Sequence, residues 1–273
     1  MTETEWQTCT DPTPMLEFLR GKATDRKLRL FAVACCRTVC ELLLDESTRR
    51  AVQIAELAAD GQADPMEQRK VLQEIGPKIN TQYGVFLCGG CDGSGSTYAA
   101  MAATATLNHA LTFTWYMGQI PAETHPAWEC VAMAQAQTAK EEAREKRWQE
   151  WDELAADAED EPDDAWYEQN ENAGYSAWDR ELAAARVAHC AILRDIFGPL
   201  PFRTLSFFST WRTPTAQAIA QSIYDERAFD HIPILADVLE EAGCTNADIL
   251  KHCRQPTEHV RGCWVVDLIL GKE

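Results

Sequence analysis

Hydrophobic residues at intervals of three and four are the feature that most constrains the fold of this chain. This spacing places side chains on one face of an α-helix, whereas a half-buried strand shows strict alternation, which is nearly absent here. One such face comprises Leu182, Ala185, His189, Leu193 and Ile196. The sequence therefore predicts an all-α protein, an irregular multi-helix domain of about ten helices.

Capping residues and glycines predict where several helices begin and end. Thr213-Pro214 is a start signal for a helix to about residue 225, and Gly198, Gly243 and Gly271 are stop signals. We also expect a core helix over 28–44, a capping box at 176–179, a helix over 247–254 capped by Thr245, and a helix over 259–270.

The middle of the chain is strongly acidic. Residues 141–181 hold 16 acidic and 4 basic side chains, a net of −12 out of −18 for the whole chain. Aromatic residues are interleaved with these charges: Trp148, Trp151, Trp166, Tyr167 and Trp178. We predict one helical domain over residues 1–273, with 141–181 as an acidic, partly flexible helical hairpin inserted in it. The aromatic residues either pack on the body of the protein or form a docking surface for a basic partner.

Composition also narrows the classes of partner and compartment. A net charge of −18 argues against direct nucleic-acid binding, which needs clustered Lys and Arg. The uncharged stretch 93–122 is rich in threonine, so we expect no membrane span there. The first residues contain no apolar run, so we expect no signal peptide. Eleven cysteines is an odd number, so we expect thiols in a reducing cytoplasm rather than a disulfide framework.

A glycine-rich segment carries the most specific local motif. It runs Cys88-Gly-Gly-Cys91-Asp-Gly-Ser-Gly95, and two thiolates three residues apart can share a tetrahedral zinc ion. The segment resembles one C-x-x-C-x-G-x-G repeat of the zinc-binding domain of DnaJ-type chaperones. In that family each zinc uses two repeats, and this chain has one, so Cys88 and Cys91 bind zinc only with two further ligands. The alternative is a glycine-rich loop with two reduced cysteines.

A second group of cysteines and histidines lies near the end of the chain: Cys244, His252, Cys253, His259 and Cys263. His259 and Cys263 are four residues apart and would share a face of the expected helix, with Cys253 close by across a turn. These three residues form a second candidate metal site, although their spacing matches no standard zinc finger. The alternative is that both cysteines are core residues and His259 makes a local hydrogen bond.

Both ends of the chain resemble an uncharacterised family of bacterial helical proteins that occurs as many paralogues. The strings that carry this resemblance include DRKLRLF at 25–31, LRDIFG at 193–198, YDERAFD at 224–230 and HVRGCWVVD at 259–267. It covers roughly residues 1–60 and 186–273, and it implies a folded helical domain without implying an activity.

No nucleophile loop, phosphate-binding motif or catalytic metal motif is recognisable in the sequence. We therefore expect a non-enzymatic, cytoplasmic protein-interaction module, stabilised by zinc if a cysteine cluster binds it, that uses the acidic surface with its tryptophans. One alternative is an enzyme whose Cys/His site in the carboxy-terminal half includes carboxylates from residues 225–230. Another is an acidic mimic of nucleic acid.

Overall fold

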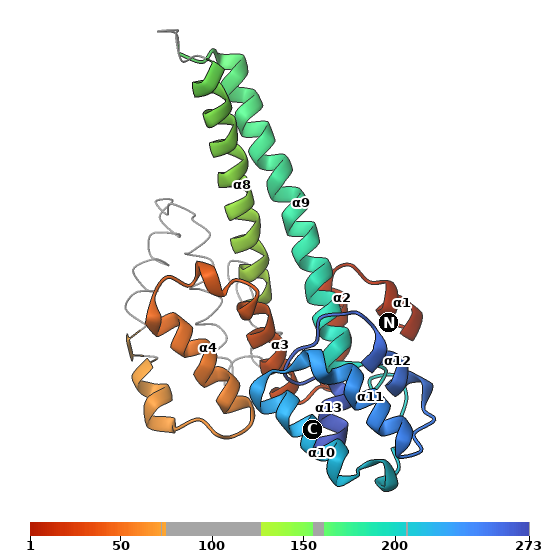
Figure 1. Ribbon diagram of the computed structural model, residues 1–273. Coiled ribbons are helices and arrows are strands. Elements are labelled where there is room, and N and C mark those ends of the chain that lie inside the picture. Colours follow the sequence, from red (N-terminus) through yellow and green to blue (C-terminus); the bar gives the residue numbers. More distant parts are fainter. Residues whose placement is uncertain (72, 75–126, 155–160, 206, 273) are drawn as a thin grey trace. The chain divides into compact units, whose positions relative to one another are not determined.

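The computed structural model describes residues 1–71, 73–74, 127–154, 161–205 and 207–272, and every regular element in these residues is a helix (Figure 1). The α-helices are α1 (Glu3–Thr8), α2 (Pro12–Leu19), α3 (Asp25–Arg37), α4 (Glu46–Ala59), α8 (Ala127–Leu154), α9 (Asp164–Phe197), α10 (Pro214–Glu226), α11 (Ile232–Glu241), α12 (Ala247–Arg254) and α13 (Trp264–Leu270). Residues 65–71 are helical as well, and short 3-10 helices span Cys40–Leu42, Ser209–Trp211 and Phe229–His231. The predicted all-α fold of about ten helices is confirmed.

Contacts divide the chain into two compact units. The terminal unit joins residues 1–34 to residues 189–273, and the central unit comprises residues 35–188. Two helices, α3 and α9, contribute residues to both units. The single domain expected over residues 1–273 stays a prediction.

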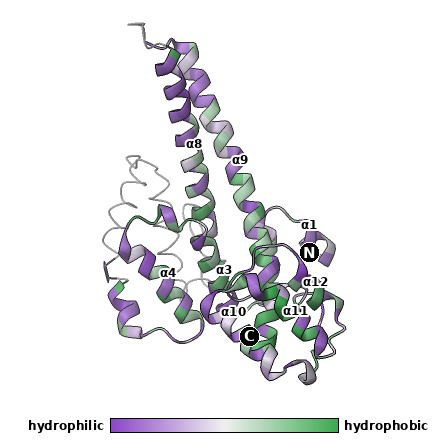
Figure 2. Cartoon of the chain, viewed as in Figure 1, coloured by the Kyte–Doolittle hydropathy of each residue, from purple (hydrophilic) through white to green (hydrophobic). Residues whose placement is uncertain are grey.

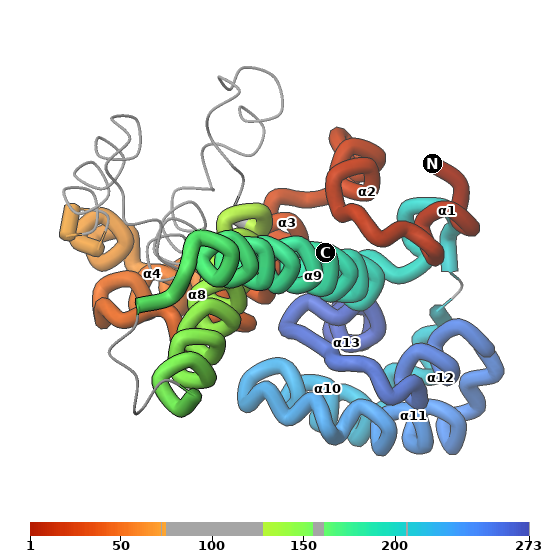
Figure 3. Tube along the Cα trace, turned by 90° about the horizontal axis from the view of Figure 1, so that it is seen from above, coloured from red at the N-terminus to blue at the C-terminus, as the bar shows by residue number. Residues whose placement is uncertain are grey.

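Four carboxy-terminal helices form a hydrophobic cluster in the terminal unit. α10 contacts α11 and α13, and α12 contacts the same two helices. The four helices therefore lie side by side (Figure 3). Their buried side chains are mainly aliphatic, with Tyr224 and Trp264 as the largest. The end of α9 adds Leu193 and Ile196, both fully buried as the helical spacing predicts.

Several helix ends follow the expected local chemistry. The Thr213 side chain accepts a hydrogen bond from the backbone N–H of Ala216 and caps α10, with proline at the first helical positions. Gly198 follows α9 with φ of +52°, and a Cβ there would lie 2.6 Å from the indole of Trp264. Only glycine fits this position, because both the dihedral angle and the space exclude a side chain.

Other predicted boundaries are wrong. Ser176 does not begin a helix, because α9 continues without a break from Asp164 to Phe197. The cap of α12 is Asn246 rather than Thr245, since its side chain accepts from the N–H groups of Asp248 and Ile249. The expected core helix over 28–44 ends at Arg37, and the expected helix over 259–270 begins at Trp264. His259 therefore lies in the segment before α13 and shares no helical face with Cys263.

The central unit contains the predicted hairpin. The first residues of α8 are apolar and buried, whereas its later turns are hydrophilic (Figure 2). The later turns pair with the first part of α9, where Arg144 forms an ion pair with Glu171 at 2.7 Å. Nearer the α4 end of the unit, Arg37 pairs with Glu56 at 2.8 Å. None of the helices in the described residues is long and apolar enough to cross a membrane.

Candidate metal centre

Four potential metal ligands lie together in the terminal unit: Asp195, His252, His259 and Cys263. One ligand atom from each residue lies within 4.8 Å of the ligand atoms of the other three. The residues come from the last turn of α9, from α12, and from the segment that leads into α13. Asp195, His259 and Cys263 are buried, and the His252 side chain is 13% exposed.

Asp195 is the centre of the contacts within this group. Its Oδ1 lies 2.6 Å from Nδ1 of His259 and 3.2 Å from Nε2 of His252. Its Oδ2 accepts a hydrogen bond of 2.8 Å from the backbone N–H of Val260. The Sγ atom of Cys263 lies 3.2 Å from Nε2 of His252 and 4.0 Å from Nδ1 of His259.

These distances are close to those of a tetrahedral zinc site. Zinc binds nitrogen and oxygen at about 2.0–2.2 Å and sulfur at about 2.3 Å, so neighbouring ligand atoms lie about 3.3–3.6 Å apart. The two contacts of His252 are 3.2 Å, whereas the Asp195–His259 contact is shorter because a proton bridges those two atoms. A metal ion that replaced this proton would need the two groups to separate by about 0.7 Å.

Backbone contacts hold the segments that carry these ligands. The ammonium group of Lys27, on α3, donates to the carbonyl oxygens of Ile196 at 2.9 Å and Gly262 at 3.1 Å. These residues directly follow Asp195 and precede Cys263, so one lysine links both sides of the group. Lys27 also forms an ion pair with Asp267 at 2.8 Å.

Gly262 has a steric role in the same segment. Its φ is +96°, and a Cβ there would lie 2.9 Å from Cδ1 of Leu30. A residue with a side chain would both strain the backbone and collide with α3. Glycine therefore allows the turn that brings Cys263 toward the histidines.

Burial and hydrogen bonding act in opposite directions on Asp195. Burial raises the pKa of its carboxyl group, but the hydrogen bonds and charges of His252 and His259 outweigh this effect and lower the pKa below its usual value. The carboxylate therefore stays ionised inside the protein, as a metal ligand must. Asp195 lies in the last turn of α9, where the helix dipole disfavours a negative charge. The two histidines and the Val260 N–H offset both this effect and the effect of burial.

Cys263 of the group and the nearby Cys253 are poor nucleophiles without a metal. Burial, with the nearby Asp195 carboxylate, raises the pKa of the Cys263 thiol well above its usual value. Burial also raises the pKa of Cys253 to about 12. Both thiols are fully buried, and a metal ion is the partner that would deprotonate Cys263 in this setting.

The group only partly coincides with the carboxy-terminal candidate site expected from the sequence. His259 and Cys263 lie together, but Cys253 is not among the four residues and packs in the hydrophobic core. On α12, Cys253 shares the buried face with Ile249, whereas the neighbouring His252 faces Asp195. Asp195 was not anticipated, because it lies 64 residues before His259 and no local spacing connects them.

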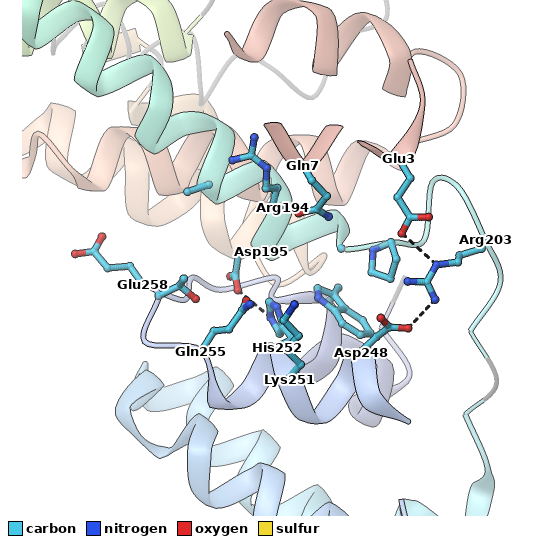
Figure 4. Close-up of a pocket in the computed structure, with 15 residues that line it drawn as sticks. Glu3, Gln7, Arg194, Asp195, Arg203, Asp248, Lys251, His252, Gln255 and Glu258 are labelled. Carbon is cyan, nitrogen blue, oxygen red and sulfur yellow. Dashed lines mark hydrogen bonds and ion pairs between the residues drawn. The ribbon is translucent and has the colours of Figure 1, made fainter. Parts of the chain in front are cut away.

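A cavity of about 540 Å³ borders the group (Figure 4). Asp195 and His252 line it, and His259 and Cys263 do not. No residue from 225–230 lines this cavity, so it does not join the carboxylates considered for an enzyme site to the Cys/His group.

The expected partner-binding aromatic residues contact one another in the hairpin. The ring of Trp166 lies 4.5 Å from that of Trp148 and 5.6 Å from those of Trp151 and Tyr167, measured between centroids. The contacts of Trp166 with Trp148 and Trp151 join α8 to α9. Tyr167 is 44% exposed, and Trp178 is half-buried further along α9.

The other expected zinc ligands, Cys88 and Cys91, lie outside the described residues, as do the rest of the glycine-rich segment and the uncharged stretch 93–122. The nine cysteines within the described residues are all thiols. Comparison with known proteins gives no match among family models, curated proteins or solved structures.

Proposed function

We propose that the protein is a metal-stabilised interaction module whose terminal unit binds a divalent ion, with zinc as the best fit. The observation that carries the proposal is the group of four potential ligands within 4.8 Å of one another. Two imidazoles, a thiolate and a carboxylate form a ligand set that zinc accepts and that the hard ions Mg²⁺ and Ca²⁺ do not favour.

The ion would have a structural role. Its ligands come from α9, α12 and the segment before α13, which are separated by up to 68 positions in the sequence. Binding would tie these three segments together and would contribute directly to the stability of the terminal unit. A reducing cytoplasm, which we also propose, suits both a metal thiolate and the buried thiols elsewhere in the chain.

Catalysis by a Cys263 nucleophile is the alternative use of the same residues. Asp195 and the histidines resemble the acid and base of a hydrolytic triad, because Asp195 contacts both imidazoles. However, Cys263 is fully buried, its pKa is raised and it does not line the cavity. A nucleophile must reach its substrate, so a metal ligand is the better assignment.

Elemental analysis of the purified full-length chain tests the proposal. We expect one equivalent of zinc in the native protein and its loss in Cys263→Ser and in His252→Gln. Cys253→Ser is a matched control, because Cys253 is equally buried in the same core but lies outside the ligand group. The double variant with serine at positions 88 and 91 tests the other cluster.

Two outcomes contradict the assignment. Zinc that is lost only from the 88/91 variant belongs to the glycine-rich motif, and zinc that is absent from the native chain leaves the Asp195 group as a hydrogen-bonded core cluster. Circular dichroism of each variant shows whether the helices are retained, so that loss of metal is separated from loss of fold.

The partner of this module, we propose, is a basic protein that docks on the hairpin. The exposed carboxylates near the end of α8 and the start of α9 include Asp152, Glu153, Glu161 and Glu168. The ring contacts of Trp166 stabilise the hairpin that presents them. Such a surface attracts a positively charged partner and weakens with added salt.

A lysine-rich helical peptide is a suitable probe for this surface. Replacement of the four carboxylates by the corresponding amides should weaken binding of the peptide about tenfold at low salt. The control neutralises four exposed carboxylates of the terminal unit: Glu17, Asp225, Glu226 and Glu241. Equal weakening in both variants would show that only net charge matters, and the hairpin would lose its assigned role.

A further inference from the structure

The cavity beside the ligand group reaches two of the potential metal ligands, which a purely structural metal site does not require. Two of the four ligands, Asp195 and His252, form part of its wall, and their side chains approach each other there in Figure 4. The other two ligands, His259 and Cys263, are buried and do not line the cavity. A metal ion bound by all four residues would therefore have protein on one side and the cavity on the other, and zinc can accept a fifth ligand.

A cation precedes each of the two ligands that line the cavity. Arg194 precedes Asp195 on α9, and Lys251 precedes His252 on α12, and both cations line the same cavity. Arg194 donates to the backbone carbonyls of Trp6 and Cys9, so its position is fixed by the amino-terminal segment. Lys251 is exposed, which leaves its ammonium group accessible to a ligand.

The other charged residues of the lining are Glu3, Arg203, Asp248 and Glu258. Arg203 forms ion pairs with Glu3 at 3.1 Å and with Asp248 at 2.6 Å, so its charge is already balanced by two carboxylates (Figure 4). Glu258 also lines the cavity and is exposed. The other two cations of the lining are Arg194, whose guanidinium group is held by the backbone carbonyls of Trp6 and Cys9, and Lys251.

We propose that an oxyanion, the carboxylate or phosphate group of a small organic molecule, enters this cavity and binds the metal ion between Asp195 and His252, beside Lys251. This inference rests on the metal site proposed above. An oxygen atom of the anion supplies the additional metal ligand, and the Lys251 ammonium group balances part of its charge. A cavity of about 540 Å³ holds more than the anionic group alone, which indicates an organic acid or a phosphate ester.

Cobalt(II) in place of zinc makes the proposal measurable, because its visible absorption reports the number and kind of ligands. Acetate and inorganic phosphate are the two probes, titrated separately into the cobalt-loaded full-length chain. We expect a saturable spectral change with at least one of them. In Lys251→Gln the affinity should fall about threefold to fivefold, because an exposed charge contributes modestly. Lys22→Gln, an exposed lysine that does not line this cavity, should retain native affinity.

The outcomes separate this inference from the metal site itself. A cobalt spectrum that neither anion changes would show a closed metal site and overturn the inference, while metal binding stands. A spectral change of equal affinity in the native chain and Lys251→Gln would also overturn it, because the anion would then bind outside the cavity. Absence of any cobalt thiolate spectrum would overturn both the metal site and the anion site.

Discussion

Replacement of Asp267 by asparagine should destabilise the terminal unit strongly. The Asp267 carboxylate is buried, and it accepts hydrogen bonds from Arg26 at 2.7 and 3.0 Å and pairs with Lys27 at 2.8 Å. The side chains of Arg26 and Lys27 are only 14% and 10% exposed. Asp267→Asn therefore leaves two largely buried cations without their shared counter-ion.

The remaining contacts limit the cost. Arg26 keeps its hydrogen bond to the Tyr224 hydroxyl at 2.7 Å, and Lys27 keeps the carbonyl oxygens of Ile196 and Gly262. The asparagine oxygen also replaces one acceptor. Removal of one partner of a buried ion pair costs about 3–5 kcal/mol, so we expect a loss near the lower end, about 3 kcal/mol of the free energy of unfolding.

Urea unfolding followed by circular dichroism measures this loss. Asp248→Asn is the control, because Asp248 also pairs with an arginine, Arg203, at 2.6 Å, but the two side chains are 40% and 43% exposed. An exposed pair contributes about 0–1 kcal/mol. If the two variants lose the same stability, or if Asp267→Asn loses less than about 1 kcal/mol, burial does not govern the strength of these pairs and the reasoning is wrong.

Three further changes have expected outcomes. Gly198→Ala should lower the unfolding free energy by about 2 kcal/mol, because its Cβ would lie 2.6 Å from the Trp264 indole; a thermal melt within a degree of native contradicts this. The raised pKa of Cys263 means that zinc must displace its proton, so the apparent zinc affinity should rise about tenfold per pH unit from pH 6 to 8; a flat profile in competition titrations excludes Cys263 as a ligand. Trp166→Ala removes the ring next to Trp148 and should speed amide hydrogen exchange in the hairpin by about tenfold or more, whereas unchanged exchange would show that the ring contacts do not hold it.

The candidate site shows which part of a binding group a sequence can predict. His259 and Cys263 are close in the sequence, and their side-chain chemistry marks them as potential ligands whatever the backbone does. The prediction that they share one face of a helix was wrong, since α13 begins only at Trp264. The choice between His252 and Cys253 depends on the rotation of α12, which is fixed by the helices against which Ile249 packs.

The sequence by itself determined the helical class, the cap at Thr213, the glycine stop at Gly198 and the acidic hairpin, because these features depend on local interactions. Periodicity and capping act between residues a few positions apart, so they can be read along the chain. Only the tertiary structure decided that Asp195 meets His252 and His259, and that Lys27 links the backbone on both sides of the group. These contacts join residues 57 to 235 positions apart, and they depend on how buried faces of several helices pack together rather than on any local preference.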